Sequence, residues 1–109
     1  DIVNRDTLTP SAAQYTADAL RQYTKEEVIE IMGAISRGLH FEEETEINCP
    51  FFIMVGDSDN AGKVKEFSLR WARTTGADYK TIPMAAHMLN VDNPGSFNLI
   101  LEKWLKSIP

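Results

Sequence analysis

The sequence is poor in the features that mark secreted, membrane and nucleic-acid-binding proteins. Its single cysteine, Cys49, cannot form an internal disulfide. No apolar run approaches the ~20 residues that a membrane-spanning helix needs, and no secretory signal peptide is visible. The 11 basic residues stand against 16 acidic ones, for a net charge of −5, and no basic stripe could follow a phosphate backbone. These absences predict a cytoplasmic protein whose partners include neither a membrane nor nucleic acid.

The chain has the length and composition of one folded unit with two differently patterned parts. Its 109 residues are 43% hydrophobic, which suffices for a core and argues against general disorder. Residues 1–46 are patterned as helices, whereas strand and helix alternate over residues 47–109, so we expect a boundary between these ranges. Because the sequence starts at Asp1 and not at a methionine, we also expect it to be a piece of a longer protein.

The first part predicts two helices with clear start signals. Thr9 stands as a cap before Pro10 at the first helical position, and Thr24 with Glu27 forms a capping box. Gly38 is placed to end the second helix in a left-handed conformation. That helix carries an apolar stripe at three- and four-residue spacing, formed by Val28, Ile31, Met32, Ile35 and Leu39.

The second part alternates strand and helix. The run FFIMV, residues 51–55, is too short for a helix and typical of a strand buried on both faces. Residues 63–75 predict a helix ended by Gly76, residues 79–83 a second short strand, and Asn93 caps a final helix. We assign to the core the side chains that recur at helical spacing: Val64, Phe67, Trp71, Phe97, Ile100, Leu101, Trp104, Leu105 and Ile108.

This order of elements predicts the α/β fold class, as a βαβα unit with two parallel strands preceded by two helices. The crossover between successive strands is right-handed and leaves them parallel. Both loops that follow the strands therefore open on the same edge of the sheet. In open parallel sheets, that edge is where ligands bind.

Three polar residues stand at that edge. Asp57 and Asp59 follow the first strand, and His87 follows the second. Because neighbouring strands lie ~4.8 Å apart, a carboxylate of the first loop can reach the imidazole of the second. Such a pair serves nucleophilic catalysis, in which histidine takes a proton from a serine-type nucleophile and later returns it, while aspartate fixes the imidazole. The spacing alone leaves either aspartate as the partner.

Two stretches joined by an amphipathic helix resemble the C-terminal part of an α/β-hydrolase. They are CPFFIMVGDSD and IPMAAHMLNVDNPGSFNLILEKWL. In that family, one core strand ends in G-x-x-D for the catalytic acid, and the next ends in A-x-H or G-x-H for the base. The resemblance implies that Asp59 is the acid and His87 the base, with Asp57 where the family often has another acidic residue. The likeness is closest from Cys49 onward. The earlier helices would correspond to the cap over the active site.

The chain departs from that family in having no nucleophile. The family's serine sits on a G-x-S-x-G elbow that precedes the acid and the base, and Ser58 is not expected to replace it. The resemblance therefore implies a C-terminal fragment of an esterase-type serine hydrolase, which supplies the acid and histidine of a catalytic triad for a small ester-like substrate. We expect the isolated chain to be inactive, because nucleophile and oxyanion hole are missing.

A non-catalytic interpretation stands beside this one: an association module, or a degenerate hydrolase-like domain, that works by dimerisation. A strand at residues 51–56 without a partner on its far side exposes backbone hydrogen-bonding groups. We therefore expect a homodimer, or association with the missing N-terminal part. The contact would use that edge or the apolar faces of the first two helices.

Metal binding is the weakest alternative. Residues 57–62, DSDNAG, are similar to the start of a calcium loop, but Ala61 and Ser68 stand where oxygen ligands belong. The positions of His40 and the acidic residues 42–44 do not match the spacing of a metal-ligand set. A run of like charges is usually a solvated surface. We therefore expect neither a metal nor a cofactor.

Overall fold

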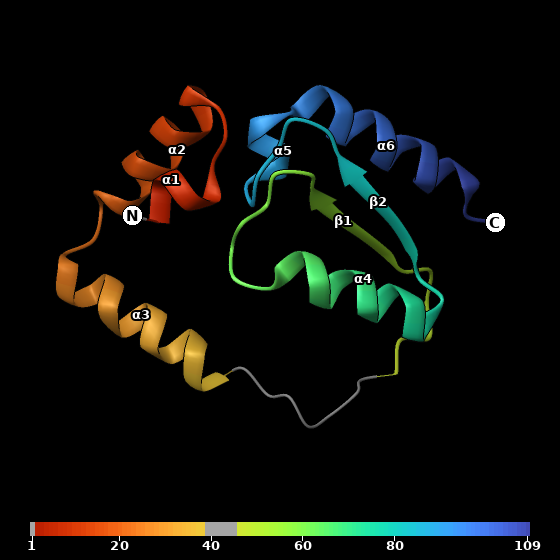
Figure 1. The fold of residues 1–109 in the computed structure, drawn as a ribbon, viewed down its shortest axis with the longest axis horizontal. Coiled ribbons are helices and arrows are strands. Elements are labelled where there is room, and N and C mark those ends of the chain that lie inside the picture. The colour runs from red at the N-terminus through yellow and green to blue at the C-terminus, as the bar shows by residue number, and fades with distance from the viewer. Residues whose placement is uncertain (1, 39–45) are drawn as a thin grey trace.

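The computed structural model describes residues 2–38 and 46–109 of the chain (Figure 1). The elements in these ranges are α1 (Ile2–Asp6), α2 (Pro10–Leu20), α3 (Lys25–Gly38), β1 (Phe52–Gly56), α4 (Val64–Thr75), β2 (Asp78–Ile82), α5 (Leu89–Asp92) and α6 (Pro94–Ser107). Helices and a two-stranded parallel sheet together make a mixed α/β fold, the class expected from the sequence. None of the helices in these ranges is long and apolar enough to cross a membrane.

The starts of the two longer N-terminal helices follow the capping signals in the sequence. The hydroxyl of Thr9 accepts a hydrogen bond from the backbone N–H of Ala12, so α2 begins as predicted. At the start of α3, the N–H of Thr24 donates to Glu27 at 2.7 Å and the N–H of Glu27 donates to the Thr24 hydroxyl at 3.2 Å. This reciprocal pair is the capping box predicted from the sequence.

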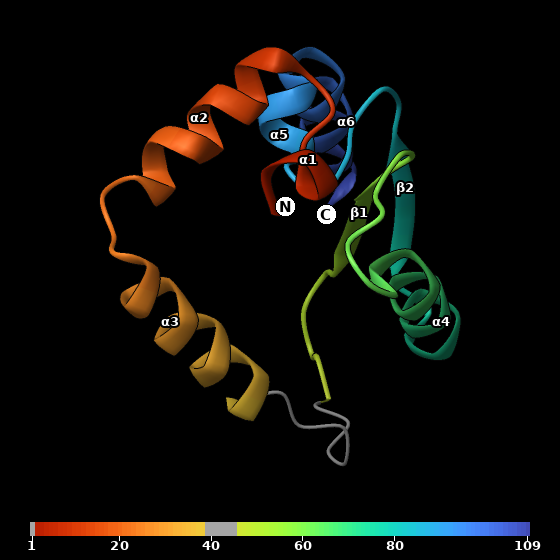
Figure 2. The same ribbon diagram turned by 60° about the vertical axis from the view of Figure 1, so that its left-hand side comes forward.

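The sheet is covered by one helix on each face. β1 and β2 are parallel, with Phe52 opposite Asp78 and Gly56 opposite Ile82. Figures 1 and 2 show α4 on one face and α6 on the other. Because successive side chains of a strand point to opposite faces, Ile53 and Val55 pack toward α4, and Phe52 stacks on Trp104 of α6.

The buried core is small. Ile53, Val55 and Ala72 form its centre. On the opposite face, the rings of Phe52 and Trp104 stack with their centroids 5.0 Å apart. Several side chains expected in the core stay half exposed, among them Phe67, Trp71 and Leu105. Two strands are too narrow to cover the apolar face of a helix of 12 or 14 residues, which explains the difference from the prediction.

The two glycines predicted to end helices behave differently. Gly76 ends α4 with φ +70°, the left-handed conformation expected there. Gly38 is the last residue of α3 and its φ is not positive, so that prediction was wrong. The sequence signal is the same at both positions, but the chain after Gly76 must turn at once into β2, which the left-handed residue allows.

The molecule exposes more surface than a compact protein of its size. Its accessible surface is 8112 Å², whereas a compact monomer of 12.3 kDa exposes about 6,100 Å². Its radius of gyration is 15.6 Å, against about 13 Å for a compact domain of this length. α3 adds to this exposure, because it lies apart from the sheet (Figure 2) and has no buried residue.

Candidate functional site

The loops that follow the two strands meet at the carboxyl edge of the sheet. β1 ends at Gly56 and leads into Asp59, and β2 ends at Ile82 and leads into His87. The side chains of the two loops are in contact there, because Nδ1 of His87 lies 3.0 Å from Oδ2 of Asp59. The aspartate–histidine contact expected from the parallel topology is therefore present.

The Asp59 carboxylate is buried and held by both oxygens. Its side chain is only 2% exposed. Oδ1 accepts the backbone N–H of Ala61 at 2.8 Å, while Oδ2 faces His87. The bond to Ala61 is an Asx turn, a local arrangement that aspartate favours two residues before the donor. The carboxylate is thus fixed in position before any other molecule arrives.

The His87 ring has one nitrogen engaged and the other open. An ionised carboxylate can only accept hydrogen bonds, so a neutral imidazole in this contact with ionised Asp59 has its proton on Nδ1 and a lone pair on Nε2. Within the described ranges no residue bonds to Nε2, and the His87 side chain is 42% exposed. The arrangement presents a basic nitrogen toward solvent, held in one tautomer by a buried acid.

Asp57 has a different task from Asp59. Its carboxylate accepts the backbone N–H groups of Met84 at 3.1 Å and Ala85 at 3.3 Å, and the hydroxyl of Ser58 at 3.0 Å. The Met84 bond, followed by that from Ser58, holds the pKa of Asp57 below its ordinary value. Asp57 therefore fixes the loop after β2 through hydrogen bonds, and Asp59 is the aspartate in contact with His87. Ser58 directs its hydroxyl to Asp57 and not to the imidazole.

The backbone before His87 is tied down at nearly every position. The carbonyl of Ala85 accepts the N–H of Ser58 at 2.9 Å, and the carbonyl of Pro83 accepts the side-chain amide of Asn93 at 2.8 Å. Met84 adopts a positive φ of 50°, which is uncommon for a residue with a side chain. These contacts fix the direction in which the loop presents its histidine.

Gly56 permits the two loops to come this close. A Cβ built at this glycine would lie 2.2 Å from the carbonyl oxygen of Ala86 and 2.3 Å from that of Ala85. Both distances are far inside van der Waals contact with rigid backbone atoms. We call residues 83–88, which join β2 to α5 and include His87, the histidine loop. Any other residue at the end of β1 would push the histidine loop away from the loop that carries Asp59.

Asp92 is a site residue that the sequence analysis missed. It is 8% exposed, and its carboxylate accepts the N–H of Ala86 at 2.9 Å, of Leu8 at 2.9 Å and of Thr9 at 2.8 Å. Burial alone would raise the pKa of Asp92, but these bonds and that from the Thr9 hydroxyl hold it below its ordinary value. The only signal in the sequence is an acid among apolar residues just before Asn-Pro.

A second acid lies close to the histidine. Asp6 is 7% exposed and forms a two-pronged pair with the guanidinium of Arg5. The hydrogen bond from Arg5 holds the pKa of Asp6 below its ordinary value against the effect of burial, and the nearby His87 acts in the same direction. The backbone carbonyl of Asp6 accepts the N–H of Met88 at 2.9 Å. The N-terminal segment therefore lies against the histidine loop.

The described residues offer no metal site. Across residues 2–38 and 46–109, no three His, Cys, Asp or Glu side chains gather around one point. The carboxylates of Asp57 and Asp59 are engaged with N–H groups and His87. The cluster of His40 with residues 42–44, considered from the sequence, lies outside the described residues.

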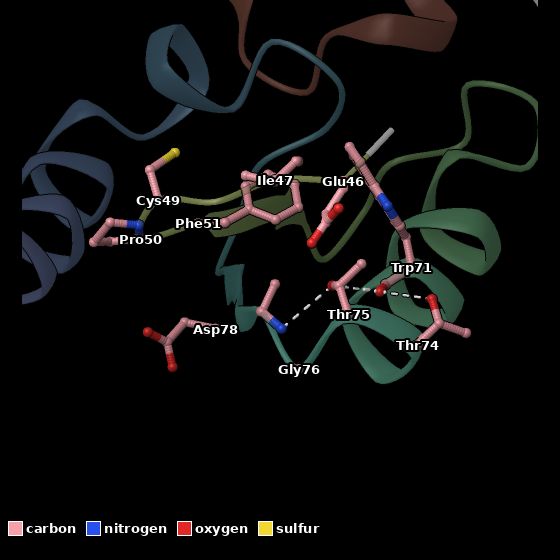
Figure 3. Close-up of a pocket in the computed structure, with 11 residues that line it drawn as sticks. Glu46, Ile47, Cys49, Pro50, Phe51, Trp71, Thr74, Thr75, Gly76 and Asp78 are labelled. Atoms are coloured by element: carbon pink, nitrogen blue, oxygen red, sulfur yellow. Dashed lines mark hydrogen bonds between the residues drawn. The ribbon is translucent and has the colours of Figure 1, made fainter. Parts of the chain in front are cut away.

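A hollow of about 630 Å³ lies at the other end of the strands (Figure 3). Trp71 and Phe51 form one wall, with their ring centroids 4.7 Å apart and edge to face. The segment before β1 from Glu46 to Pro50, the end of α4 and the start of β2 at Asp78 form the rest. Although a large hollow is often a binding site, this one contains no acid–base pair. We place the candidate site at the opposite edge, where Asp59 meets His87.

None of the family models, curated proteins or solved structures compared with this chain matches it.

Proposed function

We propose that this chain is the C-terminal part of an α/β-hydrolase-type esterase, in which His87 is the general base and acid and Asp59 orients it. The observation that carries the proposal is the 3.0 Å contact between Nδ1 of His87 and Oδ2 of Asp59. The resemblance of the motifs around these residues, in their order along the chain, supports the same assignment.

The chemistry follows from the two ring nitrogens. A serine hydroxyl from the preceding part of the protein would lie within hydrogen-bond reach of Nε2, which takes its proton as the oxygen attacks the ester carbonyl. The imidazolium that forms is stabilised by the buried carboxylate of Asp59. His87 then returns the proton to the departing alcohol, and the acyl group stays on the serine until water removes it.

The orientation of His87 is independent of the substrate. Asp59 is held by Ala61, and the loop before His87 is held by Asp57, so the pair has its geometry before a substrate binds. A catalytic base fixed in this way loses little entropy when the reaction begins. No step of this mechanism requires a metal or an organic cofactor.

The test uses the complete reading frame that contains this chain. We expect the region upstream of Asp1 to encode a G-x-S-x-G motif and the expressed protein to hydrolyse p-nitrophenyl acetate and react with a fluorophosphonate probe. His87→Ala and Asp59→Asn should each lower kcat by about 10⁴-fold, because a triad acts as a unit. Asp18→Asn, an exposed change on α2, is the control and should leave kcat unchanged. A reading frame without the motif, or full activity in His87→Ala, would overturn the proposal.

Association of two copies is a second candidate function, favoured by the exposed surface. The chain exposes about 2,000 Å² more than a compact monomer, and a standard interface removes about 800 Å² from each partner. Of the apolar stripe, Ile31, Met32 and Ile35 are exposed and Val28 is half buried, while Leu39 lies outside the described residues. Glu26 and Glu27 at its start and Arg37 at its end would face each other in an antiparallel pair of copies.

A further inference from the structure

One buried carboxylate joins the histidine loop to the N-terminal segment. Asp92 accepts the N–H of Ala86 through Oδ2, at 2.9 Å. Through Oδ1 it accepts the N–H of Thr9 at 2.8 Å and that of Leu8 at 2.9 Å, and the Thr9 hydroxyl at 2.9 Å. The carboxylate therefore bonds to two segments more than 70 positions apart in the sequence.

We propose that Asp92 is a positioning residue for His87, and that it holds the imidazole against Asp59 only while residues 8 and 9 are docked on it. The inference rests on the proposed function, in which His87 is the catalytic base. It adds a link between the base and the N-terminal helices that the resemblance assigns to the cap.

The first support is the place of the donor. Ala86 immediately precedes His87, is 2% exposed, and has the Asp92 carboxylate as its acceptor. A buried N–H that loses its acceptor is costly, so the backbone moves to find another. A rotation of the peptide at Ala86 would change the direction of the His87 side chain, whose contact with Asp59 tolerates only a few tenths of an ångström.

The second support is the contact on the other side of the histidine. Met88 follows His87, and its N–H donates to the backbone carbonyl of Asp6 at 2.9 Å. The residues before and after the histidine are therefore both held through the N-terminal segment, one directly and one through Asp92. Figure 1 shows α1 and α2 beside α5, the helix that carries Asp92.

The third support is the charge of Asp92. A carboxylate that receives four N–H or O–H donors is a strong acceptor, and charge-assisted bonds are about twice as strong as neutral ones. An asparagine of the same shape has one acceptor oxygen and an NH₂ group that would face donors. Asp92→Asn therefore removes the link with little change in volume.

The test is an NMR measurement on the 109-residue chain. In the parent protein we expect the ring of His87 to carry its proton on Nδ1, as the contact with Asp59 requires. In Asp92→Asn we expect a mixture of the two tautomers and exchange of the Ala86 amide about ten-fold faster, as the loss of one hydrogen bond implies.

A matched pair at Thr9 tests the link from its far side. Thr9→Val removes the hydroxyl bond to Asp92 together with the cap bond from the N–H of Ala12, and Thr9→Ser keeps both. We expect the valine variant to shift the His87 ring signals in the direction seen for Asp92→Asn, and the serine variant to leave them unchanged. If Asp92→Asn does not fold, this pair decides the question, and equal His87 signals in both would overturn the proposal.

The outcomes separate this inference from the proposed function. A parent protein whose His87 carries its proton on Nε2 would contradict the acid–base pair itself, whatever Asp92 does. A parent protein with the Nδ1 proton and an Asp92→Asn variant with unchanged His87 signals would leave the pair intact and overturn only the role of Asp92. Asp18→Asn, which alters an exposed acid on α2, is the control for the loss of one charge.

Discussion

Replacement of Gly56 by alanine tests how the two loops are brought together. The new Cβ would lie 2.2 Å from the carbonyl oxygen of Ala86, and that backbone atom would have to move by about 0.8 Å to reach even 3.0 Å. A shift of this size next to His87 is enough to lengthen its 3.0 Å contact with Asp59 beyond hydrogen-bond range. Overpacking against backbone costs typically about 1–3 kcal/mol of stability. We expect Gly56→Ala to show both effects.

Urea unfolding and NMR measure the two effects separately. Gly56→Ala should lower the free energy of unfolding by about 1–3 kcal/mol and change the ring signals of His87. Gly95→Ala is the matched control, since its Cβ would meet only the Asn93 side chain, at 3.9 Å, and alanine favours a helix over glycine. In the complete enzyme, Gly56→Ala should also lower kcat by about 10²-fold. A variant as stable as the parent, with unchanged His87 signals, would refute the close approach.

Two further predictions concern acid stability and association. Because the pKa values of Asp6, Asp57 and Asp92 are lowered in the folded protein, their contribution to stability is full above the ordinary value of 3.8 and is lost as the pH falls below it. The urea concentration at the unfolding midpoint should therefore decrease once the pH is below about 4, and Asp92→Asn should weaken this decrease. A variant whose midpoint depends on pH as steeply as that of the parent would contradict the prediction. For association, light scattering after size-exclusion chromatography should give twice the chain mass, and Ile31→Glu should give the monomer. Ala34→Glu, which lies off the apolar stripe, should leave the dimer intact. A parent protein that stays monomeric at high concentration would exclude the pairing of two copies through α3.

The elements that local patterns determine were predictable. Thr9, Thr24 and Asn93 cap their helices because the cap is a contact between residues two or three positions apart. The contact of His87 with a carboxylate of the first loop followed from the parallel order of two strands. The sequence left Asp57 and Asp59 as alternatives, and the resemblance favoured Asp59. Which of them reaches the imidazole depends on backbone angles within one turn, which the structure supplies.

The features that depend on distant partners were not predictable. Asp92 could be assigned no role from the sequence, because its donors at Leu8 and Thr9 come from the other end of the chain. The exposure of Trp71 was also missed, since helical periodicity indicates which face is apolar but not how much of it a narrow sheet can cover. The same limit applies to α3, whose stripe is clear in the sequence but has Ile31, Met32 and Ile35 exposed in the structure.

The contacts of residues 6–9 also bear on how a shorter version of this protein should be designed. The change of pattern at residue 47 suggests trimming the chain there for crystallisation or binding studies. A version that starts at residue 47 would discard the carbonyl of Asp6, which receives the N–H of Met88, and the donors that fix Asp92. Its imidazole would then report on a relaxed loop, and any ligand screened against it would meet a different surface.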